Sequence, residues 1–223
     1  MGQLPMKRVV VPELLDAVPA SDPGAIASRR DLRMLNGIMG NFRWLARKLA
    51  ETVRDDDLIV EIGAGDGGLA RRICAWMPHI AARYHALDLA PVPARWPEAA
   101  TWHQADLMSE SGRTLLRRAT LVVANLVLHH FDDTALREIG LMLSHCRVIL
   151  ACEPCRREWH VWQGRLLFPV LHRITRHDMI VSIRAGFRGV ELAELLGLDT
   201  ARWHCRATET LLGSYRVVAV NKS

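Results

Sequence analysis

The chain has 223 residues, of which 50% are hydrophobic and 24% charged, a composition that excludes wholesale disorder. Its length suffices for one sizeable core but is short for two independent domains. The best apolar run, residues 121–128, contains Asn125 and is far shorter than the roughly 18 residues of a membrane-spanning helix, so we expect no membrane span. The five cysteines are an odd, scattered set and no signal-peptide pattern opens the chain, so we expect a cytoplasmic protein.

The net charge of +5 comes from 29 Lys and Arg residues against 24 Asp and Glu residues. A basic chain invites comparison with nucleic-acid-binding proteins. The basic residues, however, come as dispersed pairs such as Arg29-Arg30 and Arg117-Arg118, with acids between them and no aromatic platform. This arrangement favours solvated helix faces, so a nucleic-acid partner is not expected.

Residues 1–52 are predicted to form a helical extension that acts as a lid. Leu14, Leu15 and Val18 mark a short first helical segment. Apolar residues then recur at spacings of three and four, at Leu32, Leu35, Ile38, Met39, Phe42, Leu45 and Leu49. These helices precede the first strong strand, so they are an addition to the core fold.

Residues 53–223 are predicted to form the main domain. Strands are predicted at residues 58–62, 84–89, 101–106, 121–125 and 148–152, with helical segments at 67–76, 115–118 and 133–146. Strands that alternate with helices indicate parallel β-α-β units in a doubly wound sheet.

After residue 153 the pattern changes. Residues 159–173 and 178–196 are predicted to be helical, and we expect a lid insertion at about residues 156–189. Two extended runs, 202–210 and 214–220, predict an antiparallel hairpin on the sheet edge. The predicted fold is therefore α/β, a Rossmann-like, mainly parallel seven-stranded sheet with a C-terminal antiparallel hairpin and an N-terminal helical lid.

The most specific motif is the glycine-rich turn EIGAGDGG at residues 61–68, between a predicted strand and a predicted helix. Such a turn can hold a nucleotide-like ligand against backbone N–H groups. The spacing fits two patterns, G-x-G-x-x-G through Gly68 and G-x-G-x-G through Gly67. Glu61 favours the second, because a carboxylate would repel a pyrophosphate and would attract a ligand that bears an ammonium or sulfonium group.

Two further acids follow at later strand ends. Asp88 lies where a carboxylate can accept hydrogen bonds from both hydroxyls of a ribose. Asp106 ends the third predicted strand, where it could accept a bond from an adenine amino group. Taken in this order, the glycine turn and the acids Glu61, Asp88 and Asp106 resemble the class I S-adenosylmethionine (SAM)-dependent methyltransferases.

This resemblance implies SAM as the cofactor and assigns residues to its parts. Glu61 and the turn from Gly63 through Ala64 and Gly65 to Gly67 would meet the methionine part. The ribose would meet Asp88 with Leu89, and the adenine Asp106 with Leu107. Asn125, at the end of the fourth strand, completes the expected cofactor-binding set. Taken alone, Asp88 could be a turn residue and Asp106 a helix cap.

A catalytic site is predicted after the fourth strand, where the sequence runs LHHFDD at residues 128–133. The stretch resembles the Leu-His-Asp-Trp segment of small-molecule O-methyltransferases, whose histidine deprotonates a hydroxyl. Carried over, His129 is the candidate base, and His130 stands where that family usually has Asp. The double histidine also resembles ubiquinone-type C-methyltransferases, in which its role can be packing or substrate contact.

Glu153, directly after the fifth strand, is a third catalytic candidate. It could orient the base or a substrate hydroxyl, or it could pair with Arg156 or Arg157. The spacing of the other histidines suggests no metal site, so none is assigned.

The resemblance implies transfer of a methyl group to a hydroxyl or activated carbon of a small aromatic or polyketide-like molecule, by a monomer or homodimer. Three alternatives stay open. The basic charge is compatible with RNA methylation, although the Asn/Asp-Pro-Pro-aromatic signature of amine methylation is missing. The glycine spacing is compatible with a nicotinamide (NAD-type) oxidoreductase, and no residue excludes a non-catalytic SAM-binding protein.

Overall fold

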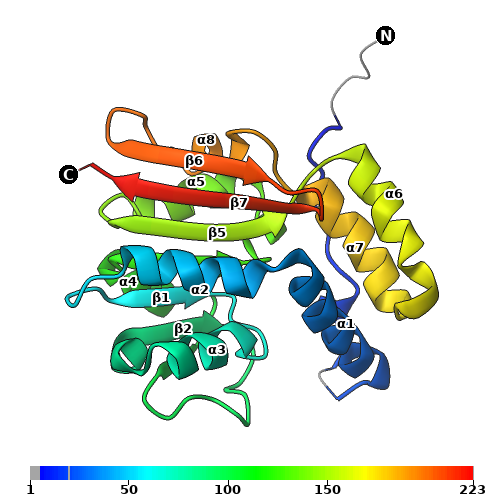
Figure 1. The fold of residues 1–223 in the computed structure, drawn as a ribbon, viewed down its shortest axis with the longest axis horizontal. Coiled ribbons are helices and arrows are strands. Elements are labelled where there is room, and N and C mark those ends of the chain that lie inside the picture. The colour runs from blue at the N-terminus through cyan, green and yellow to red at the C-terminus, as the bar shows by residue number, and fades with distance from the viewer. Residues whose placement is uncertain (1–5, 20, 223) are drawn as a thin grey trace.

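The computed structural model describes residues 6–19 and 21–222. Seven strands form one sheet in the order β3-β2-β1-β4-β5-β7-β6 (Figure 1). The strands are β1 (Ile59–Ile62), β2 (Tyr84–Asp88), β3 (Thr101–Gln104), β4 (Leu121–Asn125), β5 (Val148–Pro154), β6 (Trp203–Glu209) and β7 (Ser214–Asn221). The first five are parallel, while β7 runs antiparallel to both β5 and β6. The predicted fold class and the C-terminal hairpin are confirmed.

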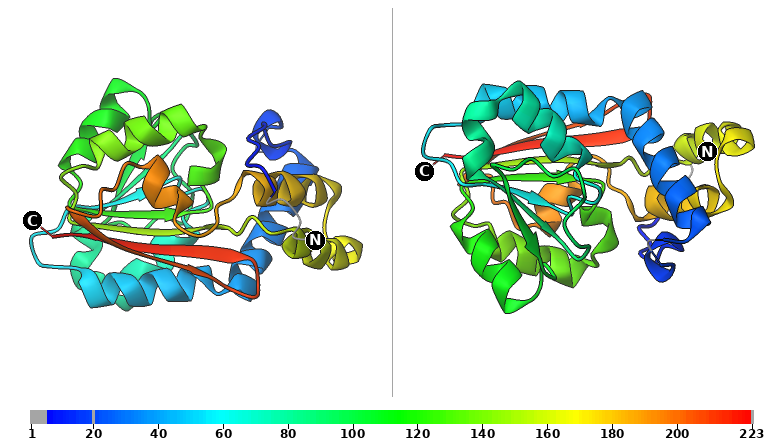
Figure 2. Two further views of the ribbon diagram at one scale, coloured as in Figure 1. Left: turned by 90° about the horizontal axis from the view of Figure 1, so that it is seen from above. Right: turned by 90° about the horizontal axis from the view of Figure 1, so that it is seen from below.

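Helices cover both faces of the sheet, as the two views of Figure 2 show. One face carries α2 (Asn41–Thr52) and α3 (Gly68–Trp76), and the other carries α4 (Glu110–Arg118), α5 (Asp133–Met142) and the short α8 (Glu191–Leu195). The central parallel strands are buried on both faces and are accordingly mainly apolar, with the polar residues Glu61, Asn125 and Glu153 near their carboxyl ends. The chain therefore folds as three layers around two apolar cores.

Beyond the carboxyl ends of the parallel strands lie the remaining helices (Figure 1). They are α1 (Pro23–Met39), α6 (Glu158–Leu166) and α7 (Arg173–Ala185). α7 packs against both α1 and α6, so segments far apart in the sequence meet there. Three short 3-10 helices, η1 (Leu15–Ala17), η3 (Leu128–His130) and η4 (Phe168–Val170), belong to the same region. This is the edge at which open α/β sheets bind ligands, between β1 and β4 where the strand order reverses.

The structure corrects three helical predictions. The stretch 32–49 is interrupted at Gly40, whose φ of 66° ends α1 and lets α2 leave in a new direction. The prediction 159–173 is wrong beyond Leu166, because a 3-10 turn that contains Pro169 separates α6 from α7.

The third correction is at Gly186, where the predicted helix 178–196 breaks. A Cβ at Gly186 would lie 2.1 Å from the carbonyl oxygen of Pro154, so the chain needs glycine to pass this close to the end of β5. The turn leaves Phe187 bridged to Cys155 before α8 begins. Within the described residues, no helix is long and apolar enough to cross a membrane.

Candidate functional site

The glycine turn follows β1 directly and opens α3. Gly63, Gly65 and Gly67 have φ values of 65°, 56° and 70°, in the left-handed region that glycine adopts at little cost. Gly68, in contrast, is the first residue of α3. The backbone therefore follows the G-x-G-x-G pattern, which is the one that Glu61 favours. A Cβ at Gly63 would also lie 2.4 Å from Cγ2 of Val127, so the turn packs tightly against the segment after β4.

Asp88, the last residue of β2, reaches the glycine turn. Its Oδ2 accepts a hydrogen bond of 2.7 Å from the backbone N–H of Gly65, and its Oδ1 accepts one of 2.8 Å from Ala90. The next residue, Leu89, is an apolar side chain left 70% exposed. The carboxylate that holds the turn is thus followed in the chain by an exposed leucine.

Asp106 lies on the neighbouring loop after β3, which ends at Gln104 rather than at Asp106 as predicted. The loop is held next to β2 because the N–H of Ala105 donates to the carbonyl of Asp88. Asp106 is exposed, and its Oδ1 accepts the N–H of Met108 at 2.7 Å. The next residue, Leu107, is buried. The predicted ribose and adenine acids therefore come from adjacent loops.

Glu61 differs from its neighbours because it lies inside the protein, only 2% exposed. Burial raises its pKa to about 8, and the nearby charges of Asp88 and Asp66 push in the same direction. The hydroxyl of Tyr84 donates to Oε2 of Glu61 at 2.9 Å and opposes part of this shift. Glu61 thus carries a proton more readily than an exposed glutamate.

Asn125 ends β4 and faces helix α1. Its Nδ2 donates to Oδ1 of Asn36 at 3.2 Å. Its own Oδ1 is buried and has no hydrogen-bond partner among the described residues. A buried acceptor without a donor costs free energy unless a ligand or water supplies one. The sheet edge therefore holds an acceptor atom ready for a hydrogen-bond donor.

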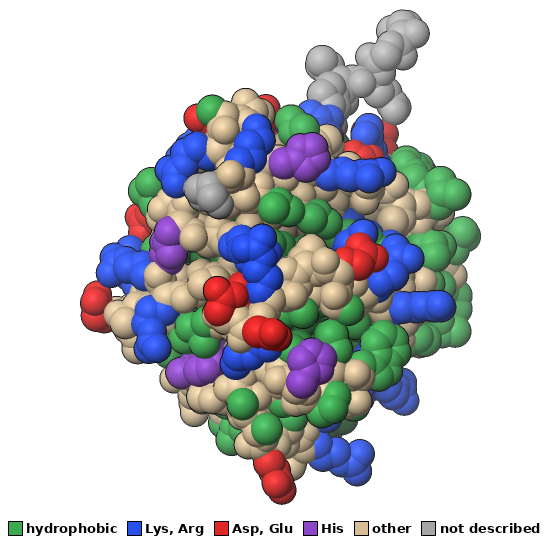
Figure 3. All heavy atoms as spheres, turned by 60° about the vertical axis from the view of Figure 1, so that its left-hand side comes forward, with side chains coloured by type: hydrophobic (Ala, Val, Ile, Leu, Met, Phe, Trp, Pro, Cys, Tyr) green, Lys and Arg blue, Asp and Glu red, His purple; other side chains and the backbone are tan. Residues whose placement is uncertain are grey.

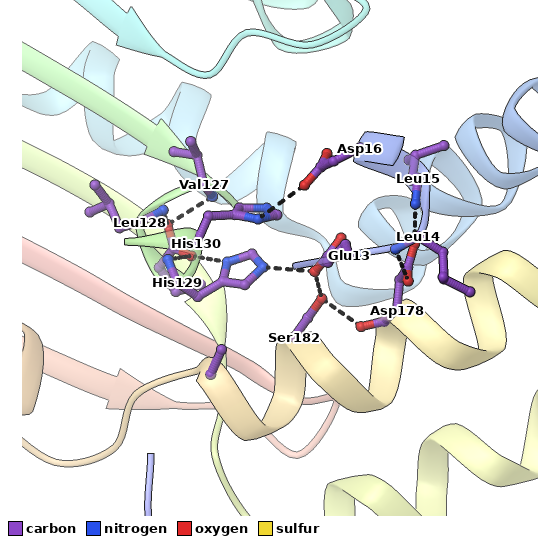
Figure 4. Close-up of polar contacts among 12 residues, drawn as sticks. Glu13, Leu14, Leu15, Asp16, Val127, Leu128, His129, His130, Asp178 and Ser182 are labelled. Carbon is purple, nitrogen blue, oxygen red and sulfur yellow. Dashed lines mark hydrogen bonds and ion pairs between the residues drawn. The ribbon is translucent and has the colours of Figure 1, made fainter. Parts of the chain in front are cut away.

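The histidine pair lies on η3, immediately after β4, and is fixed by Glu153 of β5 (Figure 4). The fully buried Glu153 carboxylate accepts N–H groups from Val127, Leu128 and His129 at 2.9 to 3.3 Å. Its Oε2 also lies 2.7 Å from Nδ1 of His129. Glu153 thereby sets both the backbone of the turn and the orientation of the imidazole.

The alternative pairing of Glu153 with the arginines that follow it is not found. Arg156 pairs with Glu191, and Arg157 pairs with Glu209. Glu153 therefore interacts with the turn that carries the two histidines and not with these arginines.

The N-terminal segment, residues 6–17, supplies two further acids that the sequence did not predict for the site. Oε1 of Glu13 lies 3.5 Å from Nε2 of His129, on the opposite side of the ring from Glu153 (Figure 4). Burial alone would lower the pKa of His129, but the hydrogen bonds and charges of Glu13 and Glu153 outweigh it and raise this pKa to about 9. His129 is thus a buried imidazolium between two carboxylates.

His130 has a different environment. Its side chain is 32% exposed against 4% for His129, and its Nδ1 lies 3.8 Å from Oδ2 of Asp16. The two imidazole centroids are 4.3 Å apart. Burial and the charge of His129 lower the pKa of His130, while burial raises that of Asp16. His130 is therefore the neutral member of the pair at neutral pH.

The N-terminal segment is tied to both η3 and α7. Arg8 donates to the carbonyls of Phe131 and Ala185 and pairs with Asp133. On α7, Asp178 accepts the N–H groups of Leu14 and Leu15 at 2.8 and 2.9 Å. These contacts place Glu13 and Asp16 against the histidines. No motif in the sequence marks them, because the partners lie more than a hundred residues away.

Glu13, His129 and His130 also have the donor types of a metal site, with one atom of each within 4.8 Å of the others. The hydroxyl of Ser182 contacts Glu13, and His129 presents a proton to the same carboxylate. These hydrogen bonds and the ion pair hold the three side chains together as an ion-pair cluster.

Solved structures share this fold. The plantazolicin methyltransferase BpumL, in complex with a triazolic desmethylPZN analog and SAH, matches with a TM-score of 0.67 at 13% identity, over 91% of this chain and 93% of that chain. Human N-acetylserotonin methyltransferase in complex with SAM matches with a TM-score of 0.55 at 18% identity, over 93% of this chain and 61% of that chain. The pyocyanin biosynthetic protein PhzM gives a TM-score of 0.54 at 15% identity, over 90% and 59% of the two chains.

At these identities the likeness establishes the fold, which is the Rossmann-like fold of these methyltransferases. No protein-family model matches the sequence, and no curated protein sequence matches it. The roles of individual residues rest on the geometry of the site itself.

Proposed function

We propose that the chain is a SAM-dependent methyltransferase that acts on a hydroxyl or activated carbon of a small aromatic or polyketide-like molecule. The observation that carries the proposal is the joint placement of the glycine turn, Asp88, Asp106 and Asn125 along one edge of the sheet. The solved structures of the same fold that contain SAM or SAH support it.

The residues present fit the cofactor. A Cβ added at Gly65 would meet no other atom within 4 Å, so the backbone of the turn is open to a ligand beside Asp88. The unpartnered Oδ1 of Asn125 suits the ammonium of the methionine part, and an ammonium held near the buried Glu61 would favour the ionised form of its carboxyl group. Asp88 with Leu89 would take the ribose, and Asp106 with Leu107 the adenine. The turn from Gly63 through Ala64 to Gly67 would hold the methionine part.

SAM, when bound, supplies an activated methyl group on a sulfonium. The protein must then align the acceptor in line with that methyl group and exclude water. A protonated acceptor also needs a base, which we place among His129, His130 and Glu153 at the carboxyl end of the sheet. Helices α1, α6 and α7 would form the lid that holds the acceptor.

Calorimetry with SAM and with its demethylated product SAH tests the proposal. Wild-type protein should bind SAH, and Asp88→Asn should weaken binding by about tenfold or more because a charge-assisted bond to the ribose is lost. Asp56→Asn, in an exposed loop at the other end of β1, is the matched control and should bind as wild type. Absence of SAH binding by wild-type protein would remove the proposal.

The alternatives are separated by their ligands. A thermal-shift comparison of NADH with SAH distinguishes an oxidoreductase, because only a true ligand raises the midpoint. RNA binding would show a steep dependence on salt. Figure 3 shows Lys and Arg side chains spread over one face among acidic and hydrophobic ones, rather than gathered in one basic field. A non-catalytic protein would bind SAH but transfer no methyl group.

A further inference from the structure

The two adjacent histidines after β4 have opposite surroundings. Both ring nitrogens of His129 face carboxylates, Nδ1 toward Glu153 at 2.7 Å and Nε2 toward Glu13 at 3.5 Å. The ring is also almost completely buried. A proton acceptor needs a free ring nitrogen within reach of the substrate. His129 offers none in this arrangement.

His130 has a free ring nitrogen, which His129 lacks. Its Nδ1 faces Asp16 at 3.8 Å, and its ring is partly open to solvent. Among the described residues, no hydrogen bond engages its Nε2. A carboxylate near Nδ1 favours the tautomer with the proton on that nitrogen, which leaves the lone pair on Nε2.

We propose that His130 is the general base of methyl transfer to a phenolic hydroxyl, and that Asp16 of the N-terminal segment is its positioning residue. The inference rests on the proposed function and deepens it, since a weakly acidic hydroxyl is the acceptor that an imidazole base suits. His129 is then a fixed cation beside the base, held by Glu13 and Glu153, and it stabilises the phenolate that develops during transfer.

The step balances without a further reactant. Nε2 of His130 takes the hydroxyl proton, and the acceptor oxygen forms a bond to the methyl carbon. The sulfur–methyl bond breaks, and the sulfur keeps the electron pair and becomes a neutral thioether. The imidazolium of His130 then returns its proton to solvent through its exposed side.

The charges around His130 come from four elements. Glu13 and Asp16 belong to the N-terminal segment, Glu153 to β5, His129 to η3, and Asp178 of α7 lies behind Asp16. Protonated His129 disfavours a second proton on His130, whereas the three acids nearest the ring favour one. The base therefore stays neutral at neutral pH yet can hold the transferred proton.

The first experiment reads the imidazoles directly, by NMR of ¹⁵N-histidine-labelled full-length protein over a pH series. His130 should be neutral at pH 7.5 with its proton on Nδ1, and His129 should be cationic. Assignments come from His129→Gln and His130→Gln. A cationic His130 at this pH, or a proton on its Nε2, would overturn the proposal. In Asp16→Asn, the Nδ1 tautomer of His130 should lose its dominance.

The second experiment measures single-turnover transfer of labelled methyl from SAM to a panel of simple phenols that includes catechol and resorcinol. His130→Gln should lower the rate by about 100-fold or more, the range of general-base catalysis, with SAH affinity unchanged. The rate that remains should lose its dependence on an imidazole ionisation. His79→Gln, in an exposed position before β2, is the matched control and should keep the wild-type rate.

Asp16→Asn should shift the pH-rate profile and lower the rate by less than the loss of His130, and Asp16→Glu should restore part of it. A merely structural role for Asp16 would change stability without moving the profile, which contradicts the proposal. If SAH binds and no phenol is methylated, or His130→Gln transfers at the wild-type rate, the inference fails while cofactor binding stands. If SAH does not bind, the proposed function itself fails.

Discussion

Oε2 of Glu153, at the end of β5, lies 2.7 Å from Nδ1 of His129, and the same carboxylate caps three successive backbone N–H groups of the turn after β4. One buried side chain therefore connects two neighbouring strands at the edge where the proposed chemistry takes place. Its removal should affect the fold as well as the site.

We expect Glu153→Gln to lower the free energy of unfolding by about 2 to 4 kcal/mol, because an amide cannot accept all four bonds and leaves a buried cation without its partner. Urea denaturation measures the change. Glu98→Gln, an exposed position between β2 and β3, is the control and should stay within about 0.5 kcal/mol of wild type. Equal stability of the two variants would contradict the assigned role of Glu153.

The pKa of about 9 for His129 predicts a pH dependence of stability. In the unfolded chain the pKa of histidine is about 6.5, so the folded state binds the proton more tightly. The stabilisation is therefore complete below pH 6.5 and is lost as the pH rises through 9. Urea titrations from pH 6 to 10 should show this decline in wild type and a smaller one in His129→Gln. The same pH dependence in both proteins would show that His129 does not cause the decline in stability.

Replacement of Glu61 is expected to affect stability and cofactor binding in opposite directions. Its pKa is raised to about 8 by burial, so the folded state resists its ionisation and stability falls as the pH rises from about 4.5 through 8. Glu61→Gln removes this decline and should be more stable than wild type at pH 8.5 but not at pH 4. The same variant should bind SAM more weakly above pH 8, where the Glu61 carboxylate of the wild type is ionised and attracts the ammonium group. Unfolding curves at the two pH values and calorimetry read the two effects separately.

Two glycines of the turn separate backbone strain from steric overlap. Gly63 and Gly65 both have positive φ, but an added Cβ would lie 2.4 Å from Val127 at the first and would meet nothing within 4 Å at the second. Gly65→Ala should therefore cost about 1 kcal/mol of stability from the left-handed conformation alone. Gly63→Ala should cost clearly more, about 2 to 4 kcal/mol. Similar losses in the two variants would show that Val127 moves aside freely.

Local patterns in the sequence predicted the parts of the fold that local physics controls. The strand, glycine turn and helix at residues 58–76 carry their own signals, in an apolar run, left-handed glycines and an amphipathic face. The sequence placed Asp88 at a strand end but did not predict its hydrogen bond to Gly65 in the neighbouring turn. The break at Gly186 was missed because its cause is the distant carbonyl of Pro154, which no nearby residue reveals.

The acids of the N-terminal segment were missed for a similar reason. Glu13 and Asp16 sit in a short stretch with no motif, and their positions depend on Asp178, which is 164 residues from Leu14. The sequence pointed to His129 and His130 together, yet the difference between them comes from which carboxylate each ring meets. Tertiary contacts decide that difference, and the spacing of two adjacent histidines carries no information about it.

The attachment of Arg8 to Phe131 and Ala185 also has a consequence for synthesis on the ribosome. The N-terminal segment leaves the ribosome before its partners on η3 and α7, which are translated more than a hundred residues later. It cannot dock during the early folding of β1, α3 and β2, since the surface that receives it does not yet exist. Glu13 and Asp16, which complete the histidine cluster, are thus synthesised well before the histidines and α7 that fix their positions.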